Sequence, residues 1–309
     1  MKIAVVGCGA MGSIYAALFA SAGNEVFAVD ANEAHVQAIN EKGLRLSGVS
    51  GDRTVRIEAF SEAPQKTADL IIVAVKATHV PSAITNILAL LEADSIVLAI
   101  QNGLGSAEQL AAALGKRGLL IGVAQGFGAS LPAPGVAHHN DMKAIKIGSL
   151  TVGGVKQAES GKAEKISGLW RQAGFNASAE RDIGRIQWEK LICNVAYSAP
   201  CAIAGMTVGE VLNDQFVGPI SRAAAQEAWQ VARACGIEPS FDDPAQEVRD
   251  FAVRMPGAKP SVVLDIEAGQ ESEIEFINGA VPREAAKIGM TAPVNETLTR
   301  LVRSIESRR

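Results

Sequence analysis

Three polar side chains recur at four-residue intervals within an apolar stretch. Lys190, Asn194 and Ser198 lie in the run WEKLICNVAYS, which begins at Trp188. On a helix these positions share one face, so an ammonium, an amide and a hydroxyl form a stripe among apolar neighbours. Such a stripe needs partners, either a ligand in a cleft or water. We favour a ligand because other polar residues accompany the stripe, and a solvated helix face is the alternative.

The accompanying residues lie where segments of the chain begin or end. Asn102 follows the apolar run Ser95–Ile100, and Lys76 follows the run Ile71–Val75. If these runs are strands of an open α/β sheet, both side chains lie at carboxyl ends, where such sheets bind ligands. Glu273 is expected at the start of a helix. The alternatives are an ordinary Asn-Gly turn, a solvated lysine and a helix-capping glutamate.

A glycine-rich turn follows the first apolar run, Ile3–Val6, and precedes a helical pattern. Its residues are Gly7, Cys8, Gly9, Ala10, Met11 and Gly12. The G-x-G-x-x-G spacing between a strand and a helix is the signature of a dinucleotide-binding turn. Gly7 permits the tight turn, Gly9 lets the backbone approach a pyrophosphate, and Gly12 allows close packing of helix and strand. A turn that binds no ligand is the alternative.

Asp30 ends the second predicted strand, at a position that bears on the choice of cofactor. An acidic side chain there can accept hydrogen bonds from the 2′-hydroxyl of the adenosine ribose. A 2′-phosphate would meet like charge, and the following Ala31-Asn32-Glu33 supplies no cation to bind it. The sequence therefore predicts NAD(H) rather than NADP(H). The alternative is that Asp30 only caps the following helix.

The first half of the chain alternates short β-branched runs with helical patterns, which predicts a parallel sheet with crossover helices. The predicted strands are Ile3–Val6, Glu25–Asp30, Leu70–Val75, Ser95–Ile100 and Leu119–Ala124, and the predicted helices include Met11–Ala22, Glu33–Glu41 and Ala107–Leu114. We expect Gly135–Asn140 and Lys143–Gly148 to extend the same sheet in antiparallel fashion. A helix at Gly161–Gln172 and a short strand at Ala177–Arg181 close this half.

From Arg185 onward the pattern is helical, with no convincing strand. The predicted helices are Arg185–Tyr197, Gln215–Cys235, Pro244–Met255, Ser261–Ala268, Ile274–Ile288 and Asn295–Glu306. Pro200 and Pro256 predict breaks, and Gly236 predicts a C-terminal cap. The fold expected is α/β, with a Rossmann-type dinucleotide-binding domain at residues 1–181 and an all-helical substrate-binding and catalytic domain at residues 182–309.

The composition argues against several classes of function. The 309 residues carry a formal charge of −4 and no dense run of lysine or arginine, so neither nucleic acid nor a membrane surface is an expected partner. No uninterrupted apolar run reaches the roughly 20 residues that a membrane-spanning helix needs, so none is expected. The four cysteines fit a reduced, cytoplasmic setting. His138 and His139 point to opposite faces of a predicted strand, so no metal site is predicted.

With these motifs assembled, the chain resembles the ketopantoate reductase (2-dehydropantoate 2-reductase) family. The resemblance extends from Met1 to about Val302. It rests on GCGAMG at Gly7, VKA around Lys76, QNGLG at Gln101, WEKLICN at Trp188 and ESEIEFINGA at Glu271, in the order of the family. The resemblance implies an oxidoreductase that transfers a hydride from a nicotinamide to the keto group of a 2-oxo acid. The first substrate to expect is ketopantoate, reduced to D-pantoate in pantothenate biosynthesis.

The resemblance also implies a role for each matching residue. Lys190 matches the catalytic lysine, a general acid that polarises the ketone and delivers a proton. Glu273 matches a glutamate that orients Lys190 or binds a substrate hydroxyl. Asn102 would bridge nicotinamide and substrate, and Lys76 would lie near the cofactor. The remaining substrate-binding positions would be Asn194, Ser198 and Ser261.

Four positions depart from the family pattern. Ala31 stands where an arginine usually supports NADP, which agrees with an NAD preference. Ser198 stands where a second asparagine is common, and Ala258 and Val263 replace an expected asparagine and methionine. Each lost amide removes hydrogen bonds worth about 0.5–1.5 kcal/mol, enough to change the preferred 2-oxo acid. The first alternative is therefore an NAD-dependent D-2-hydroxyacid dehydrogenase of the mandelate type, acting on branched or aromatic 2-oxo acids.

Two more alternatives come from other families and classes. The β-hydroxyacid dehydrogenases share a G-x-G-x-M-G turn and a K-x-x-x-N helix, but their D-x-P-V-S-G segment has no match in residues 126–135. A protein that binds or senses NAD(H) without catalysis would have no need of both Lys190 and Glu273. A helical second domain often dimerises, so a homodimer stays an open expectation.

Overall fold

The computed structural model describes residues 1–308 apart from 116–117, 127, 153–154, 157 and 159–160. The chain divides into two units by its internal contacts. The α/β unit comprises residues 1–101 and 106–183, and the helical unit comprises residues 102–105 and 184–309. The short loop 102–105 thus belongs with the helices, although it follows a strand of the α/β unit in sequence.

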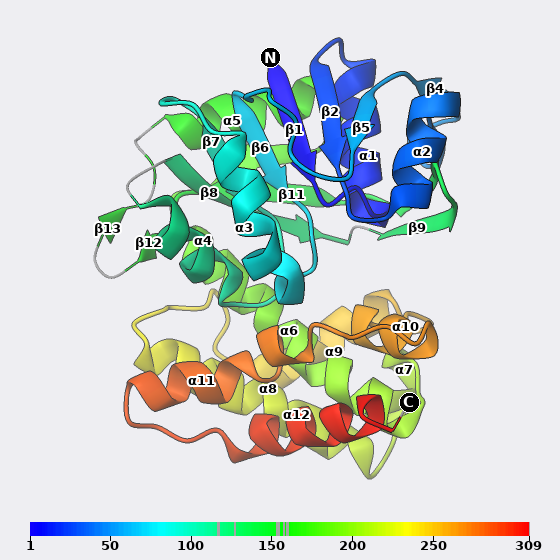
Figure 1. Ribbon diagram of the computed structural model, residues 1–309. Helices are drawn as coiled ribbons and strands as arrows, with labels where there is room; N and C mark the ends of the chain where they lie inside the picture. The colour runs from blue at the N-terminus through cyan, green and yellow to red at the C-terminus, as the bar shows by residue number, and fades with distance from the viewer. Residues whose placement is uncertain (116–117, 127, 153–154, 157, 159–160, 309) are drawn as a thin grey trace. The chain divides into compact units, whose positions relative to one another are not determined.

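An eight-stranded sheet forms the centre of the α/β unit (Figure 1). Its apolar strands are covered on both faces, so that Ile3, Leu70 and Ile71 have no exposed surface. In spatial order the strands are β14 (Ala177–Ala179), β11 (Ala144–Gly148), β8 (Gly118–Gln125), β7 (Ile96–Ala99), β6 (Leu70–Val73), β1 (Lys2–Val6), β2 (Glu25–Val29) and β5 (Glu58–Phe60). The strands from β8 to β5 are parallel, which confirms the predicted parallel sheet, and β11 is antiparallel to β8.

Helices connect the parallel strands and cover the sheet (Figure 1). They are α1 (Ala10–Ser21), α2 (Glu33–Lys42), the 3-10 turn η1 (Ala77–His79), α3 (Val80–Ala89), α4 (Ser106–Leu114) and α5 (Lys162–Gln172). Strand β1 pairs with β2 on one side and with β6 on the other, so the strand order reverses at β1. The turn after β1 therefore lies at a topological switch point, where open α/β sheets bind ligands.

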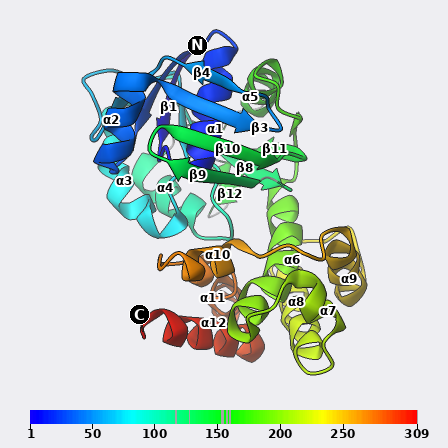
Figure 2. The same ribbon diagram turned by 90° about the vertical axis from the view of Figure 1, so that its right-hand side faces the viewer.

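A second, four-stranded sheet packs against α1, and Figure 2 shows three of its strands, β3, β10 and β9, side by side. Its strands are β4 (Arg53–Val55), β3 (Leu44–Gly48), β10 (Val136–Asp141) and β9 (Gly128–Ala133). A separate two-stranded sheet pairs β12 (Thr151–Val152) with β13 (Val155–Lys156). The expectation that Gly135–Asn140 extends the main sheet is therefore wrong. Strand β10 pairs instead with β9 and, in parallel, with β3. The expectation for Lys143–Gly148 is confirmed, because β11 joins the main sheet.

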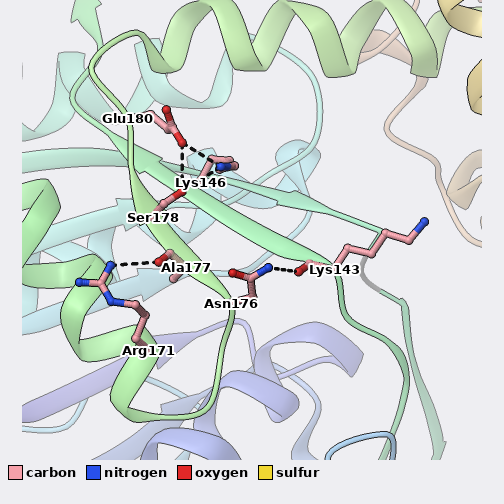
Figure 3. A network of polar contacts seen from close by, with 7 residues as sticks. All are labelled: Lys143, Lys146, Arg171, Asn176, Ala177, Ser178 and Glu180. Carbon is pink, nitrogen blue, oxygen red and sulfur yellow. Dashed lines mark hydrogen bonds and ion pairs between the residues drawn. The ribbon is translucent and has the colours of Figure 1, made fainter.

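The short edge strand β14 is held by side chains as well as by its backbone (Figure 3). The Lys146 ammonium donates to Ser178 Oγ and Glu180 Oε1, both at 2.9 Å. Arg171 on α5 donates to the carbonyl of Ala177 at 3.0 Å. These bonds join β14 to both β11 and α5, which explains how a strand of three residues keeps its place at the edge of the sheet.

The helical unit contains no strand among residues 184–308. Its elements are α6 (Ile183–Ala204), α7 (Val208–Asn213), α8 (Val217–Ala234), α9 (Pro244–Arg254), α10 (Ser261–Glu267), the 3-10 turn η2 (Ile274–Phe276), α11 (Ala280–Lys287) and α12 (Pro293–Glu306). Gly236 follows α8 with φ +80° and caps its end as predicted, and α9 ends before Pro256. None of the described helices has the length and hydropathy needed to cross a bilayer.

Two helix predictions in this unit are wrong. Pro200 does not break α6, which continues to Ala204, because the flanking Ala199 and Cys201 are fully buried and their packing offsets the lost backbone bond. The single helix expected over Ile274–Ile288 is instead η2 followed by α11. Ile277 leaves the helical region at ψ −94°, so the chain turns between the two elements.

Each unit has its own apolar core, and the core of the α/β unit contains a cluster of aromatic rings in mutual contact. Tyr15 and Phe19 on α1 each lie 5.0 Å from the Trp170 ring of α5, measured between ring centroids, in edge-to-face geometry. Phe175 lies 4.6 Å from the same ring. Such pairs add stabilisation beyond their buried area. The cluster ties the first helix of the unit to its last.

We predict that Phe19→Ala lowers the free energy of unfolding by about 3–5 kcal/mol, because it leaves a cavity in this cluster. Phe216→Ala is the matched control, since the Phe216 side chain is 72% exposed and its loss should change stability by less than about 0.5 kcal/mol. Urea unfolding of the two purified variants measures both values. Equal losses would contradict the assignment of this cluster as core.

Candidate functional site

The glycine-rich turn after β1 is built as the spacing predicts. Gly7 has φ +91°, which favours glycine, and a Cβ there would overlap the backbone between Ala74 and Val75. A Cβ at Gly12 would overlap the carbonyl oxygen of Gly7. Both positions therefore require glycine for the packing of the turn against its neighbours.

Gly9 differs from these two glycines because nothing within the protein requires it. A Cβ at Gly9 would meet no atom within 4 Å, and the residue is exposed at the N-terminus of α1. Gly9 is the N-cap of that helix and supplies no side-chain capping bond. Free space above a helix N-terminus is what a pyrophosphate needs in order to reach backbone N–H groups. The turn fits a dinucleotide.

Asp30 lies half-buried just after β2, with its side chain turned back to the local chain. Its Oδ1 accepts the N–H of Asn32 at 2.8 Å. The N-cap of α2 is Asn32, whose side chain accepts the N–H of His35 at 3.1 Å. Asp30 is therefore not the N-cap of α2, although its carboxylate accepts a backbone N–H just before that helix.

Lys190 and Asn102 meet in the helical unit. The Lys190 ammonium on α6 donates to the Asn102 amide oxygen at 2.7 Å. Glu273, which is only 7% exposed, precedes η2 and acts on Lys190 through its negative charge. Three residues that lie far apart in sequence thus form one polar group: a cation, an amide and a carboxylate.

The position of Lys190 changes its acidity. Burial lowers the pKa of Lys190 from its ordinary value to about 8, and the Glu273 carboxylate limits the fall by favouring the charged form. At neutral pH the side chain is a cation that releases its proton more readily than a solvated lysine. Such a perturbed pKa beside a specific charge partner is typical of groups that take part in proton transfer.

The loop 102–105 holds Asn102 against the segment that carries Glu273. The Leu104 N–H donates to the Phe276 carbonyl at 2.9 Å. Gly103 has φ +78°, and a Cβ there would overlap that same carbonyl, so a side chain at this position would push the loop away. The Asn-Gly pair therefore does form a tight turn, which was the alternative considered for Asn102. The same turn also presents Asn102 to Lys190.

Arg283 is a supporting residue that the sequence interpretation missed. Its guanidinium on α11 donates to the carbonyl of Leu104 at 2.7 Å and to that of Glu275 at 3.1 Å. Asn278 makes a similar connection, donating to the carbonyl of Val195 on α6 at 3.0 Å. These contacts fasten the Asn102 loop and the Glu273 segment to their surroundings. No local pattern around Arg283 indicates the contact, because its partners are backbone atoms of distant segments.

The remaining predicted residues are three for the substrate and Lys76 for the cofactor, and they lie on α6, on α10 and after β6. Asn194 is half-buried one turn after Lys190 on α6, and Ser198 is buried a further turn along. The low exposure of Ser198, 3%, contradicts a solvated helix face. Ser261 is exposed on the first turn of α10, and Lys76 is half-buried at the end of the chain segment that follows β6.

The two histidines of β10 make hydrogen bonds within the second sheet and to the turn that follows β3. His138 Nδ1 lies 2.9 Å from Ser47 Oγ, and His139 Nδ1 lies 2.5 Å from Ser50 Oγ. The two rings thus bind hydroxyl groups of β3 and of the turn that follows it. Over the described ranges, no group of His, Cys, Asp and Glu side chains has the arrangement of a metal site.

Comparison with known proteins identifies the family. Residues 3–151 match the ketopantoate reductase PanE/ApbA family, and residues 182–306 match the C-terminal domain of the same family. A 2-dehydropantoate 2-reductase of Archaeoglobus fulgidus is 33% identical over 99% of this chain and 98% of its own length. This chain belongs to the ketopantoate reductase family. The expected family and fold class are thereby confirmed.

The chain is similar in structure to solved ketopantoate reductases and to solved D-mandelate dehydrogenases. A PanE/ApbA family ketopantoate reductase from Ralstonia eutropha superposes with a TM-score of 0.90 at 31% identity, over 100% of this chain and 99% of the other. A ternary structure of D-mandelate dehydrogenase with NADH and anilino(oxo)acetate superposes with a TM-score of 0.89 at 26% identity, with the same coverage. Both relatives are oxidoreductases, which fits an enzyme that uses a nicotinamide cofactor.

We predict that Glu273→Gln lowers the pKa of Lys190 below about 8, because the glutamine is nearly isosteric but carries no charge to favour the ammonium. The measurement is the pH titration of the Lys190 side-chain carbon signals by NMR, which needs neither substrate nor cofactor. Glu275→Gln is the matched control, since Glu275 pairs with Arg303. If both variants titrate like the parent chain, Glu273 does not act on Lys190.

Proposed function

We propose that this chain reduces the keto group of a 2-oxo acid with a nicotinamide cofactor, most directly ketopantoate to D-pantoate. The observation that carries the proposal is the contact of Lys190 with the Asn102 amide oxygen at 2.7 Å, beside the buried Glu273. A partly desolvated ammonium with a lowered pKa is suited to giving a proton to a developing alkoxide. Membership of the ketopantoate reductase family supports the reaction class.

Lys190 is the general acid in this proposal. When bound, the nicotinamide supplies the hydride that adds to the keto carbon of the substrate. The ammonium stabilises the negative charge that develops on the keto oxygen and transfers one proton to it, so the product is a 2-hydroxy acid. Asn102 orients the ammonium through its amide oxygen, and Glu273 favours its protonated form. Asn194, Ser198 and Ser261 are the proposed contacts to the rest of the substrate.

Cofactor binding is proposed for a domain of residues 1–181, and substrate binding and catalysis for residues 182–309, to which the loop 102–105 adds Asn102. The turn Gly7 to Gly12, with Cys8, Ala10 and Met11 between the glycines, would hold the pyrophosphate through its backbone. Asp30 would accept the ribose 2′-hydroxyl, and Lys76 would lie near the cofactor. The carboxylate of Asp30 and the absence of a cation at Ala31 support NAD(H) over NADP(H).

A mandelate-type D-2-hydroxyacid dehydrogenase is the second candidate. The observation in its favour is the loss of amide groups at two positions, Ser198 and Ala258, where the family pattern has asparagine. A less polar pocket suits a branched or aromatic 2-oxo acid better than hydroxylated ketopantoate. The structural similarity to a D-mandelate dehydrogenase that binds NADH agrees with this candidate as well.

A substrate panel distinguishes the candidates. We predict that ketopantoate with NADH gives the highest kcat/KM among ketopantoate, 2-oxoisovalerate, phenylpyruvate and benzoylformate, each measured with NADH and with NADPH. A higher value for benzoylformate or phenylpyruvate would favour the mandelate-type enzyme. A clear preference for NADPH would refute the cofactor assignment. Binding of NADH without turnover of any 2-oxo acid would indicate a non-catalytic NAD(H)-binding protein.

Lys190→Ala should reduce kcat by about 10²–10⁴-fold, because it removes the general acid, while the Kd for NADH stays nearly constant. In the parent chain, kcat/KM should fall as pH rises through about 8, where Lys190 loses its proton. Steady-state kinetics over a pH series checks both expectations. Lys287→Ala, which removes an exposed lysine of the same unit, is the control. Equal activity in the two variants would rule out the acid role.

Gly9→Ala should weaken NADH binding about tenfold or more while leaving the melting temperature nearly unchanged, because the new methyl group enters the space proposed for the pyrophosphate and touches no protein atom. Gly257→Ala is the control, since a Cβ there also meets nothing within 4 Å. Fluorescence titration with NADH and thermal unfolding measure the two effects. Unchanged affinity in Gly9→Ala would place the cofactor elsewhere.

A further inference from the structure

A chain of buried polar contacts lies directly beneath the dinucleotide-binding turn. The Ser13 hydroxyl on α1 donates to the carbonyl of Cys8 at 2.7 Å and lies 3.2 Å from Nε2 of His35 on α2. On the other side of the ring, the Gly135 N–H donates to His35 Nδ1 at 2.9 Å. Three segments that are distant in sequence thus meet here: the turn with the start of α1, helix α2, and the turn before β10.

The donors and acceptors in this chain fit only one form of the His35 ring. Nδ1 accepts the Gly135 N–H, so it carries no proton. The Ser13 hydroxyl has one proton, which it gives to the Cys8 carbonyl, so Ser13 Oγ must accept from the ring. Both ends therefore require the neutral ring with its proton on Nε2. The Cys8 thiol lies 3.5 Å from Ser13 Oγ and can donate to its second lone pair.

The surroundings of His35 maintain this neutral form. His35 is 1% exposed and Ser13 is fully buried. Burial lowers the pKa of His35 below its ordinary value, against the opposing influence of the Asp30 carboxylate and the Cys8 carbonyl. A ring that stays neutral at physiological pH keeps Nδ1 as an acceptor and Nε2 as a donor. The contact chain therefore holds under the conditions in which the protein works.

The Cys8 carbonyl is the point at which these contacts reach the ligand side of the turn. Cys8 C=O and Gly9 N–H belong to the same peptide plane and point in opposite directions. Ser13 holds the carbonyl toward the buried side, so the Gly9 N–H is directed away from it. Gly9 itself is exposed, with open space where a side chain would be. The buried Ser13 hydroxyl thus sets the direction in which the Gly9 N–H points.

We propose that His35 is a positioning residue for the dinucleotide-binding turn. Through its Nε2–H it fixes the Ser13 hydroxyl, which fixes the Cys8 carbonyl and thereby aims the Gly9 N–H at the pyrophosphate. The inference rests on the proposed binding of a dinucleotide to this turn. It assigns to α2 and to the turn between β9 and β10 a part in cofactor affinity, although neither segment contains a residue of the G-x-G-x-x-G motif.

Two substitutions separate the two sides of the ring. His35→Asn keeps an acceptor near the position of Nδ1 and loses the donor to Ser13, whereas His35→Gln keeps a donor near the position of Nε2. We expect His35→Asn to raise the Kd for NADH and for ADP-ribose by about tenfold, and His35→Gln by less than about threefold. Binding of AMP, which lacks the pyrophosphate, should change little in either variant. At saturating NADH, kcat should stay within about twofold, because the chemical step is untouched.

Ser13→Ala tests the next contact in the chain. It should raise the Kd for NADH as much as His35→Asn does, and the double variant should bind no more weakly than Ser13→Ala, because both changes break one path. The ring nitrogen signals of His35 in cofactor-free protein, measured by NMR, should show a protonated Nε2 and an unprotonated Nδ1. A ring protonated on Nδ1 would overturn the assignment without any reference to cofactor binding.

The outcomes also separate this role from the proposed function. If the parent chain binds NADH and His35→Asn lowers only the melting temperature, His35 is structural and this proposal is wrong. Additive losses in the double variant, or equal losses in His35→Asn and His35→Gln, would likewise overturn it. If the parent chain binds neither NADH, NADPH nor ADP-ribose, the proposed cofactor is wrong and the positioning role is lost with it.

Discussion

The burial of one ammonium group is the constraint on which the polar interior of the helical unit depends. Lys190 projects from an α6 whose neighbouring residues, Leu191 and Ile192, are fully part of the apolar core. A charge in such surroundings is stable only if oxygen atoms replace the water that it loses. The Asn102 amide and the Glu273 carboxylate supply this replacement. The negative charge of Glu273 favours the ammonium form against the desolvation that lowers the pKa of Lys190.

This requirement explains why distant segments converge. The Asn102 loop contributes no helix or strand of its own, yet its Leu104 N–H and carbonyl are both bonded, to Phe276 and Arg283. Arg283 also binds the carbonyl of Glu275, two residues after Glu273. One guanidinium therefore fixes the loop that carries the amide and the segment that carries the carboxylate. The glycine-rich turn after β1 is also fixed by a buried side chain, because the Ser13 hydroxyl, which has partners on both sides, holds the carbonyl of Cys8.

Local patterns predicted most of the fold, and the failures have identifiable physical causes. The buried runs that became β1, β2, β6, β7 and β8 are nearly continuous and apolar, so their ends were predicted to within two residues. Strands β3, β4 and β9 were not predicted, because β3 alternates buried and exposed residues over only five positions and the residues of β4 and β9 are partly or fully exposed. The pairing that joins β3 to β10 links positions about 90 residues apart, so no local pattern indicates it. Pro200 was expected to end a helix because local preference favours a break, but the packing of its neighbours prevails.

The candidate site was likewise only partly predictable from local sequence patterns. The residue types at Gly7, Asp30, Asn102, Lys190 and Glu273 stood out because each lies in a motif or at a segment end. The hydrogen bond between Lys190 and Asn102 joins positions 88 residues apart, and no spacing rule predicts it. Arg283 and His35 escaped notice for a related reason. Their partners are main-chain groups and a hydroxyl brought close by tertiary packing, so they leave no pattern in the sequence.

Chemical rescue tests the central claim, that Lys190 supplies the proton, most directly. The turnover of Lys190→Ala with NADH and a 2-oxo acid would be measured in the presence of a series of small primary amines of different pKa. If Lys190 is the general acid, the protonated amines restore activity in proportion to their concentration, and the rescued rate varies systematically with amine pKa at matched size. If no amine restores turnover although the variant is folded and binds NADH, or if rescue is independent of amine pKa, Lys190 does not deliver the proton.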